Sequence, residues 1–439
     1  MKHKKTMILI SELIIIFVLL ACYYFIFWDK PRAMDNEAES TKQDNAAGIL
    51  KNLYTAKQVQ IEDEVGPKIK AEIEVSNNIV NIKQDIFLKD AVDAIHLYIP
   101  SYNALKITLK NVSAERGLLN IIRGDHNLKV DFEEKQDKIH LEYEIVLDKK
   151  RDTLSYSDNF IFLTNFLITP AVYKNGAPLF VYKSSFGDPY LYDINNYDIK
   201  LTTDKRLQIY APGKIDEQII GREKITVFQA ENIRDFPIIL FRNAEVHTEK
   251  YGDIDIYYID AYAAKDYVES ALQFASSNIG PYPYKELLVV KAPLLQKGME
   301  FSNTIFIGDD CFDNQEVLKR VTYHEVLHQW FYGIIGTDQL NEPFFDEGLV
   351  NYLALMLSNS QITGYYNPKL FQLQLKDYSS KDEYYRLVYY DSAVYFYTLH
   401  KKMGDDFFKL LQRIYAKGKF SIVYFDEFLN YTKEFLGGN

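Results

Sequence analysis

Two histidines, His324 and His328, stand four positions apart, and Glu325 directly follows the first of them. The apolar residues Val321 and Phe331 continue the same spacing of three and four, which predicts that both imidazoles project from one face of a helix. Residues four apart on a helix lie side by side, as two imidazoles must to hold one metal ion. Glu325 is offset by about 100° around the helix, so it could reach a water at that ion without ligating it.

The two histidines and the glutamate between them do not establish a metal site alone. A chain of 439 residues with 8 histidines has about a 1% chance of containing this pattern at random, so a third ligand is needed as support. Without it, two histidines in a helical core would be the simpler interpretation. Glu347 follows His328 by 19 positions, on the apolar face of a second predicted helix. A cation relieves the cost of burying such a carboxylate. We therefore predict one Zn²⁺ per chain, held by His324, His328 and Glu347 with a fourth position open for catalysis. Asp346 is either a hydrogen-bond partner of a ligating imidazole or an exposed acid at the start of the helix.

Composition excludes several other classes of protein. Hydrophobic residues make up 47% and charged residues 25%, which is typical of a globular chain long enough for two or three domains. A net charge of -11 makes nucleic acid an unsuitable partner, since phosphate binding needs a basic surface. The two cysteines, Cys22 and Cys311, rule out a disulfide framework and a cysteine-rich metal site. The sequence gives no indication of an oligomeric state.

The N-terminus contains an apolar run at residues 7–28, preceded by Lys2, Lys4 and Lys5. Such a run is long enough to span a bilayer core of about 30 Å. We predict a single-pass anchor in the cell membrane, with the rest of the chain outside the cytoplasm because the lysines stay inside. Two alternatives are a cleaved signal peptide and a lipoprotein modified at Cys22.

The chain divides into four predicted segments: the anchor or signal segment at 1–32, a polar linker at 33–60, a β-rich domain at 61–245 and a catalytic domain at 246–439. The β-rich segment shows short runs of period-two alternation, typical of strands in a β-sandwich-like domain. Helical patterns dominate the last segment after two apolar strands. The predicted fold class is multidomain α+β, with a β-sandwich-like domain followed by an α+β domain that ends in helices.

These features resemble the aminopeptidase N family of gluzincin metallopeptidases. The resemblance runs from about residue 60 nearly to the end, and rests first on the H-E-x-x-H pattern followed after eighteen residues by Glu347. Four further segments support the resemblance. Residues 297–301 are similar to the family's G-x-M-E-N motif, and residues 279–284 are similar to its G-x-Y-P-Y motif. His328–Phe331 and residues 187–199 also resemble family sequence. The resemblance implies a thermolysin-like catalytic domain. It also implies a shortened C-terminus, because members commonly continue into a large helical domain beyond the position of Asn439.

The resemblance also implies roles for individual residues. Glu300, with Gly298 and Met299 beside it, would bind the free α-amino group of a substrate, and such a contact selects for chain ends. Tyr389 would donate a hydrogen bond to the tetrahedral oxyanion, with Tyr390 as the alternative.

The predicted reaction is hydrolysis of peptide bonds, in which Glu325 activates the attacking water and residues are released from the N-termini of peptides. Two alternatives keep the same zinc site: an endopeptidase, and a hydrolase of small lipid epoxides. A third alternative, of a different class, is a membrane-tethered binding protein that keeps the fold without the chemistry.

Overall fold

The computed structural model describes residues 65–100, 106–184, 187 and 189–437. The predicted anchor at 1–32 and linker at 33–60 lie outside the described residues. Within the described ranges, no helix is both long enough and apolar enough to cross a membrane. Glu64–Asn439 form one compact unit, which is described below as a β-rich part and an α+β part.

The β-rich part is built on a nine-stranded sheet. In β1 every second side chain is buried, so one face of the sheet lies on a core. Neighbouring strands are antiparallel except for β1 and β11, which pair in parallel. The order is β13 (Lys214–Ile220), β14 (Glu223–Ile233), β11 (Asn195–Asp204), β1 (Lys68–Ser76), β2 (Ile79–Tyr98), β5 (Asn127–Val146) and β3 (Lys106–Ser113), with β4 (Leu118–Arg123) on β5 and β8 (Thr169–Pro170) on β2.

A second, smaller sheet completes the β-rich part. Its order is β12 (Gln208–Tyr210), β15 (Ile238–Phe241), β7 (Phe160–Leu163) and β6 (Ser155–Tyr156). Buried residues of both sheets, among them Ile73, Leu141, Ile209 and Leu240, belong to one hydrophobic cluster. The two sheets therefore enclose a common core, as in a β-sandwich. A short hairpin of β9 (Tyr173–Lys174) and β10 (Ala177–Pro178) adjoins them.

The α+β part begins with a five-stranded sheet in the order β16 (Val246–Tyr251), β17 (Ile254–Ile259), β18 (Glu286–Ala292), β20 (Thr304–Gly308) and β19 (Gly298–Phe301). Strands β17, β18 and β20 are parallel, whereas β19 runs antiparallel along the edge. The 3₁₀ turn η1 (Tyr262–Ala264) and helix α3 (Lys265–Asn278) connect β17 to β18, and η2 (Asp309–Asp313) leads from β20 into helix α4 (Gln315–Leu327).

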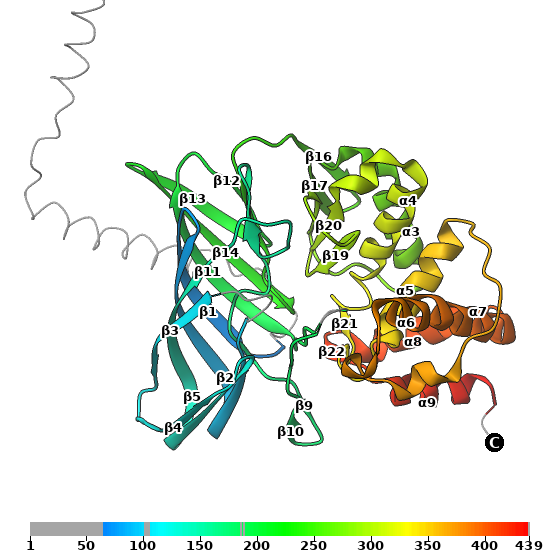
Figure 1. The fold of residues 1–439 in the computed structure, drawn as a ribbon, viewed down its shortest axis with the longest axis horizontal. Coiled ribbons are helices and arrows are strands. Elements are labelled where there is room, and N and C mark those ends of the chain that lie inside the picture. Colours follow the sequence, from blue (N-terminus) through cyan, green and yellow to red (C-terminus); the bar gives the residue numbers. More distant parts are fainter. Residues whose placement is uncertain (1–64, 101–105, 185–186, 188, 438–439) are drawn as a thin grey trace, which may run out of the picture. The chain divides into compact units, whose positions relative to one another are not determined.

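Helices form the rest of the chain (Figure 1, yellow to red). They are α5 (Phe344–Leu357), α6 (Lys381–Tyr384), α7 (Ser392–Met403), α8 (Asp406–Gly418) and α9 (Phe425–Phe435), with 3₁₀ turns η3 (Pro368–Gln372) and η4 (Leu375–Asp377), the π-helix η5 (Tyr385–Asp391), and the short strands β21 (Ile335–Gly336) and β22 (Ser421–Ile422). A Cβ on Gly348 would lie 2.3 Å from Ser392, so glycine permits the close approach of α5 and α7. The predicted α+β class, with a β-rich domain followed by a domain that ends in helices, is confirmed.

Arg234 fastens the two parts together. Its guanidinium is fully buried and donates to the carbonyl oxygens of Tyr192 at 2.9 Å, Tyr332 at 2.5 Å, Ile334 at 3.3 Å and Ser421 at 2.7 Å. Burial lowers the pKa of this guanidinium. Because carbonyl oxygens satisfy the donors of the buried cation, one side chain of the β-rich part holds the loop after α4 and strand β22 in place.

Candidate active site

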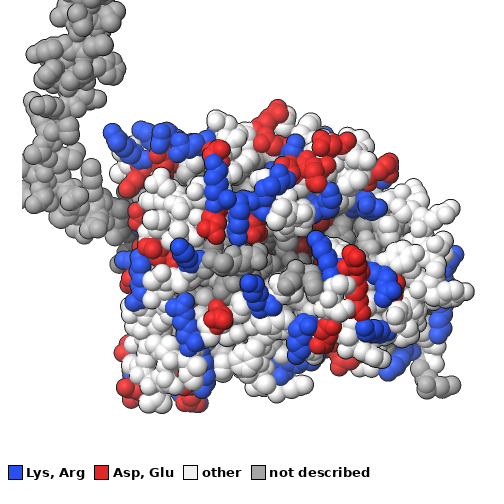
Figure 2. Space-filling model, viewed as in Figure 1, with Lys and Arg blue, Asp and Glu red and all other residues white. Residues whose placement is uncertain are grey.

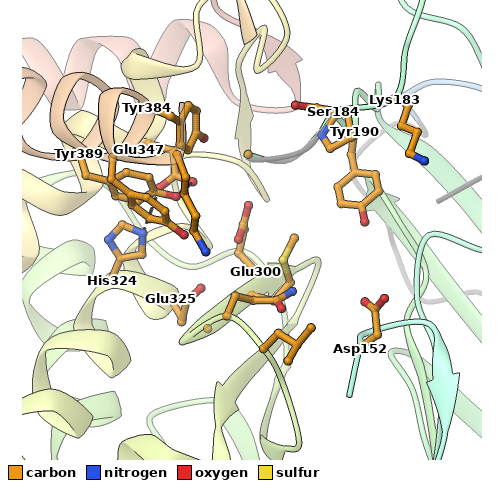
Figure 3. A pocket seen from close by; sticks show the side chains of 18 of the residues that line it. Asp152, Lys183, Ser184, Tyr190, Glu300, His324, Glu325, Glu347, Tyr384 and Tyr389 are labelled. Atoms are coloured by element: carbon orange, nitrogen blue, oxygen red, sulfur yellow. Dashed lines mark hydrogen bonds and ion pairs between the residues drawn. The ribbon is translucent and has the colours of Figure 1, made fainter. Parts of the chain in front are cut away.

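Helices α4 and α5 bring the three predicted metal ligands together. Nε2 of His324 lies 3.0 Å from Nε2 of His328 and 3.1 Å from Oε2 of Glu347. The remaining pair, Nε2 of His328 and Oε2 of Glu347, is 3.4 Å apart. His328 and Glu347 are buried, and His324 borders the pocket shown in Figure 3. Residues that are 23 positions apart in sequence thus converge on one point.

These three side chains fit a zinc ion. Zinc bonds of about 2.0–2.1 Å in tetrahedral geometry place neighbouring ligand atoms about 3.3 Å apart. The donor atoms here are separated by 3.0–3.4 Å, close to that value. Burial alone would raise the pKa of Glu347, but the two imidazoles beside it lower that pKa strongly, which favours the ionised carboxylate that a metal site needs. His324, His328 and Glu347 are therefore positioned to hold a metal ion, and the ligand set implies Zn²⁺.

The second nitrogen of His328 fixes its tautomer. Nδ1 lies 2.9 Å from the carbonyl oxygen of Phe331, and since a carbonyl can only accept, Nδ1 carries the proton. Imidazole binds a metal in its neutral form. In that form of His328, Nε2 carries the lone pair, which faces the other two ligands.

The predicted role of Asp346 is wrong in both of its forms. The carboxylate is fully buried, not exposed, and it accepts hydrogen bonds from Thr337 at 2.7 Å, Gln339 at 3.1 Å and the backbone N–H of Glu347 at 2.9 Å, not from an imidazole. Burial, and then the charge of Glu347, raise the pKa of Asp346 to about 6. Asp346 therefore fixes the first turn of α5 and orients its neighbour Glu347.

Glu325 and Glu300 line the same pocket as the ligand cluster (Figure 3). A Cβ on Gly298 would lie 2.0 Å from Oε1 of Glu325, so the absence of a side chain at Gly298 makes room for that carboxylate. Although burial opposes protonation of His328, the charges of Glu300, Glu347 and Glu325 raise its pKa well above the usual range. The carboxylates thus create a strongly negative potential that favours a cation.

Hydrogen bonds from two directions hold the strand that carries Glu300. Oδ1 of Asp235, in the β-rich part, accepts from the backbone N–H of Ser302 at 2.8 Å. Gln329, the residue after His328, donates to the carbonyl oxygen of Phe301 at 2.9 Å. Phe301 itself is buried in a core, where the related family motif has asparagine. The hairpin of β19 and β20 is therefore held against both the metal-binding helix and the β-rich part.

The structure places Tyr389, and not Tyr390, beside the ligand cluster. The hydroxyl of Tyr389 donates to Oε1 of Glu347 at 2.6 Å, and its ring stacks on His324 with centroids 5.9 Å apart. Tyr390 is half exposed and donates to the carbonyl oxygen of Thr363. Both lie in the π-helix η5, a form that is frequent at functional sites.

The pocket, of about 280 Å³, has a second wall that the sequence did not reveal. Its residues come from connections of the β-rich part, far from the zinc motif in sequence, and no local spacing relates them to it. They are His126, Arg151, Asp152, Lys183, Ser184 and Tyr190. Met299 and Gly298 also line the pocket, from β19.

Comparison with known proteins agrees with this geometry. Residues 262–438 match the model of the Peptidase family M1 domain. No curated protein matches the chain at a significant level. An M1 zinc metallopeptidase from Deinococcus radiodurans has a similar fold, with a TM-score of 0.61 at 13% identity over 85% of this chain and 91% of that one. A mutant of that enzyme bound to a Tyr-Ser-Ala substrate is similar to the same degree, with 13% identity over 85% and 92% of the two chains.

Proposed function

We propose that this chain is a zinc-dependent aminopeptidase. Its residues 262–438 match the Peptidase family M1 domain, and its described unit has a fold similar to that of an M1 zinc metallopeptidase. The observation that carries the proposal is the convergence of three zinc ligands, a candidate base and a candidate amine-binding carboxylate on one pocket. The peptide bound to the Deinococcus enzyme supports peptides as the substrate class.

The chemistry that zinc supplies in such a site is polarisation of the scissile carbonyl and acidification of water. Glu325 lies one residue beyond a ligand and faces the pocket, so its carboxylate is the group suited to take the proton of the attacking water. The same carboxylate would then pass the proton to the leaving amine. The hydroxyl of Tyr389 donates to Glu347 in this structure, and from this place beside the ligand cluster it is the group suited to donate to the oxyanion of the tetrahedral intermediate.

Glu300 supplies the preference for chain ends. Its carboxylate is buried and lies between the ligand cluster and the far wall of the pocket (Figure 3). An ionised carboxylate in such a position binds an ammonium by a charge-assisted contact, and an internal peptide bond offers no such partner.

Replacing Glu300 with alanine is expected to lower kcat/KM for free-amine peptides by roughly 10–150-fold, the equivalent of about 1.5–3 kcal/mol for a shielded charge-assisted contact. Amino-acetylated peptides cannot make the contact, so wild type should cleave them poorly and the variant should lose little further rate. The diagnostic quantity is the ratio of kcat/KM between the two substrate types, because general damage to the zinc site cancels in it.

Equal cleavage of free and acetylated peptides by wild type would contradict the aminopeptidase proposal. It would favour an endopeptidase with the same zinc chemistry. Hydrolysis of small lipid epoxides without turnover of any peptide would favour the epoxide hydrolase instead, and binding of peptides without turnover would favour the tethered binding protein.

We also propose that residues 7–28 attach the protein to the cell membrane, with the peptidase outside the cytoplasm. The apolar run and its flanking lysines support this proposal. Full-length protein should sediment with membranes and resist high-salt and alkaline extraction, whereas a chain that starts at Ala33 should stay in solution. Recovery of the full-length protein only from the soluble cytoplasmic fraction would contradict attachment.

A further inference from the structure

The pocket extends beyond the amine-binding position. In Figure 3, His324 and Glu347 lie on one side, Glu300 lies in the middle, and Lys183, Ser184 and Tyr190 lie across the pocket on the β-rich part. Consider a peptide whose α-amino group is bound at Glu300 and whose scissile carbonyl lies at the ligand cluster. Its chain ends at Glu300, so no further residue of the peptide extends from there toward the far wall. Only the side chain of its N-terminal residue can reach the far wall.

Among the described charged side chains of the far wall, Lys183 is the one without an ion-pair partner. Arg151 is in an ion pair with Asp309 and also donates to the carbonyl oxygen of Leu294. Asp152 is in an ion pair with Lys150 at 2.9 Å. Lys183 is exposed to the pocket and forms no ion pair with any carboxylate of the described residues.

The charge of Lys183 affects the pKa of a neighbouring histidine. The pKa of neighbouring His126 is lowered, first by burial and further by the charge of Lys183, against an opposing effect of Asp125. The neutral form of His126 is therefore favoured beside the cation of Lys183.

A second cation, Lys381, lines the pocket from the start of α6. Its Nζ lies 5.4 Å from the centre of the Tyr385 ring, which stacks on Tyr389 with centroids 5.3 Å apart. No carboxylate of the described part of the chain forms an ion pair with Lys381. Lys183 and Lys381, which have no ion-pair partner among the described residues, thus line a pocket whose other end carries the carboxylates Glu300, Glu325 and Glu347.

We propose that this pocket selects peptides whose N-terminal residue is acidic, with Lys183 receiving the side-chain carboxylate and Lys381 adding to the positive potential. This inference rests on the proposed aminopeptidase activity. It follows from charge complementarity, since an N-terminal glutamate or aspartate presents an ammonium to Glu300 and a carboxylate to the lysines. A basic N-terminal side chain would meet like charge and is disfavoured.

The test compares glutamyl and glutaminyl dye substrates, which have the same shape and differ in charge. Wild type should show a kcat/KM at least about 10-fold higher for the glutamyl substrate, the lower end of a charge-assisted hydrogen bond. Lys183→Gln should lower that ratio toward one, to the smaller preference that Lys381 alone supplies, while Lys183→Arg should keep a clear glutamyl preference. Lys285→Gln, which removes an exposed lysine outside the pocket, should leave the ratio at the wild-type value.

The outcomes separate the two proposals. Turnover of both substrates by wild type with a ratio of one or below would overturn the acidic preference and leave the aminopeptidase intact. A glutamyl preference that is unchanged in Lys183→Gln would overturn the role of Lys183. Absence of turnover on every aminoacyl substrate, with cleavage of internal peptide bonds, would instead contradict the aminopeptidase proposal itself.

Discussion

Glu325→Gln is expected to lower kcat by at least about 100-fold, the scale on which a lost general base acts. Glutamine has nearly the shape of glutamate and can occupy the space that Gly298 leaves for this side chain, but it cannot accept the proton of the attacking water. The metal ligands are unchanged, so the variant should bind zinc as wild type does. Steady-state rates on an aminoacyl dye substrate and metal analysis of the purified variant would measure the two effects separately.

A matched control is Glu342→Gln. Glu342 is also a largely buried glutamate of the α+β part, where it accepts from the backbone N–H of Phe425 at 2.8 Å, and glutamine keeps that acceptor. It does not line the pocket, so its variant should retain a rate close to that of wild type. If Glu325→Gln loses only a few-fold in kcat, another group carries the proton.

His324→Ala and Glu347→Ala are expected to lose zinc and activity together. Each variant leaves two protein donors where the structure brings three within reach of one ion, and a catalytic zinc site uses three. Glu347→Ala should also leave Tyr389 without the acceptor that it uses in this structure. Bound zinc per chain and turnover would be measured on the same preparations.

His247→Ala is the control for the loss of an imidazole. His247 lies in an exposed ion pair with Glu245 and stacks on Tyr262, away from the pocket. This variant should keep both zinc and activity. Stoichiometric zinc in both His324→Ala and Glu347→Ala would show that the ligand assignment is wrong.

The metal ligands could be placed from the sequence because helix geometry relates them. His324 and His328 are one turn apart on the same segment, so their proximity follows from local periodicity alone. Glu347 needed only the assumption of a second helix that packs against the first, and α5 packs on α4 in this way. The same periodicity indicated the alternating strands of the β-rich part, of which β1 is an example.

The surroundings of the ligands could not be placed, because they depend on pairings between distant segments. The sequence marks Asp346 as an acid at a helix start, and nothing local shows that Thr337 and Gln339 turn back to bond it. Arg234 likewise meets carbonyl oxygens almost 100 or more positions away, at Tyr332 and Ser421.

The far wall of the pocket was missed for the same reason. Lys183 follows a short hairpin of the β-rich part and carries no motif, so its position opposite Glu300 emerges only when both parts are folded. Surface charge gives no guide either, since acidic and basic side chains are intermixed on the face shown in Figure 2. Tyr389 was recognised through family resemblance, because a π-helix does not follow the periodicity on which sequence patterns rely.

The central claim is that zinc at His324, His328 and Glu347 removes N-terminal residues from peptides. Its most direct test is the turnover of an aminoacyl dye substrate by residues 33–439 in three samples. The first is the untreated protein, the second is protein from which a chelator has removed the metal, and the third is that metal-free protein after addition of one equivalent of zinc. We expect activity in the first sample, loss of activity with loss of bound zinc in the second, and recovery in the third. Full activity in a zinc-free preparation would contradict the claim.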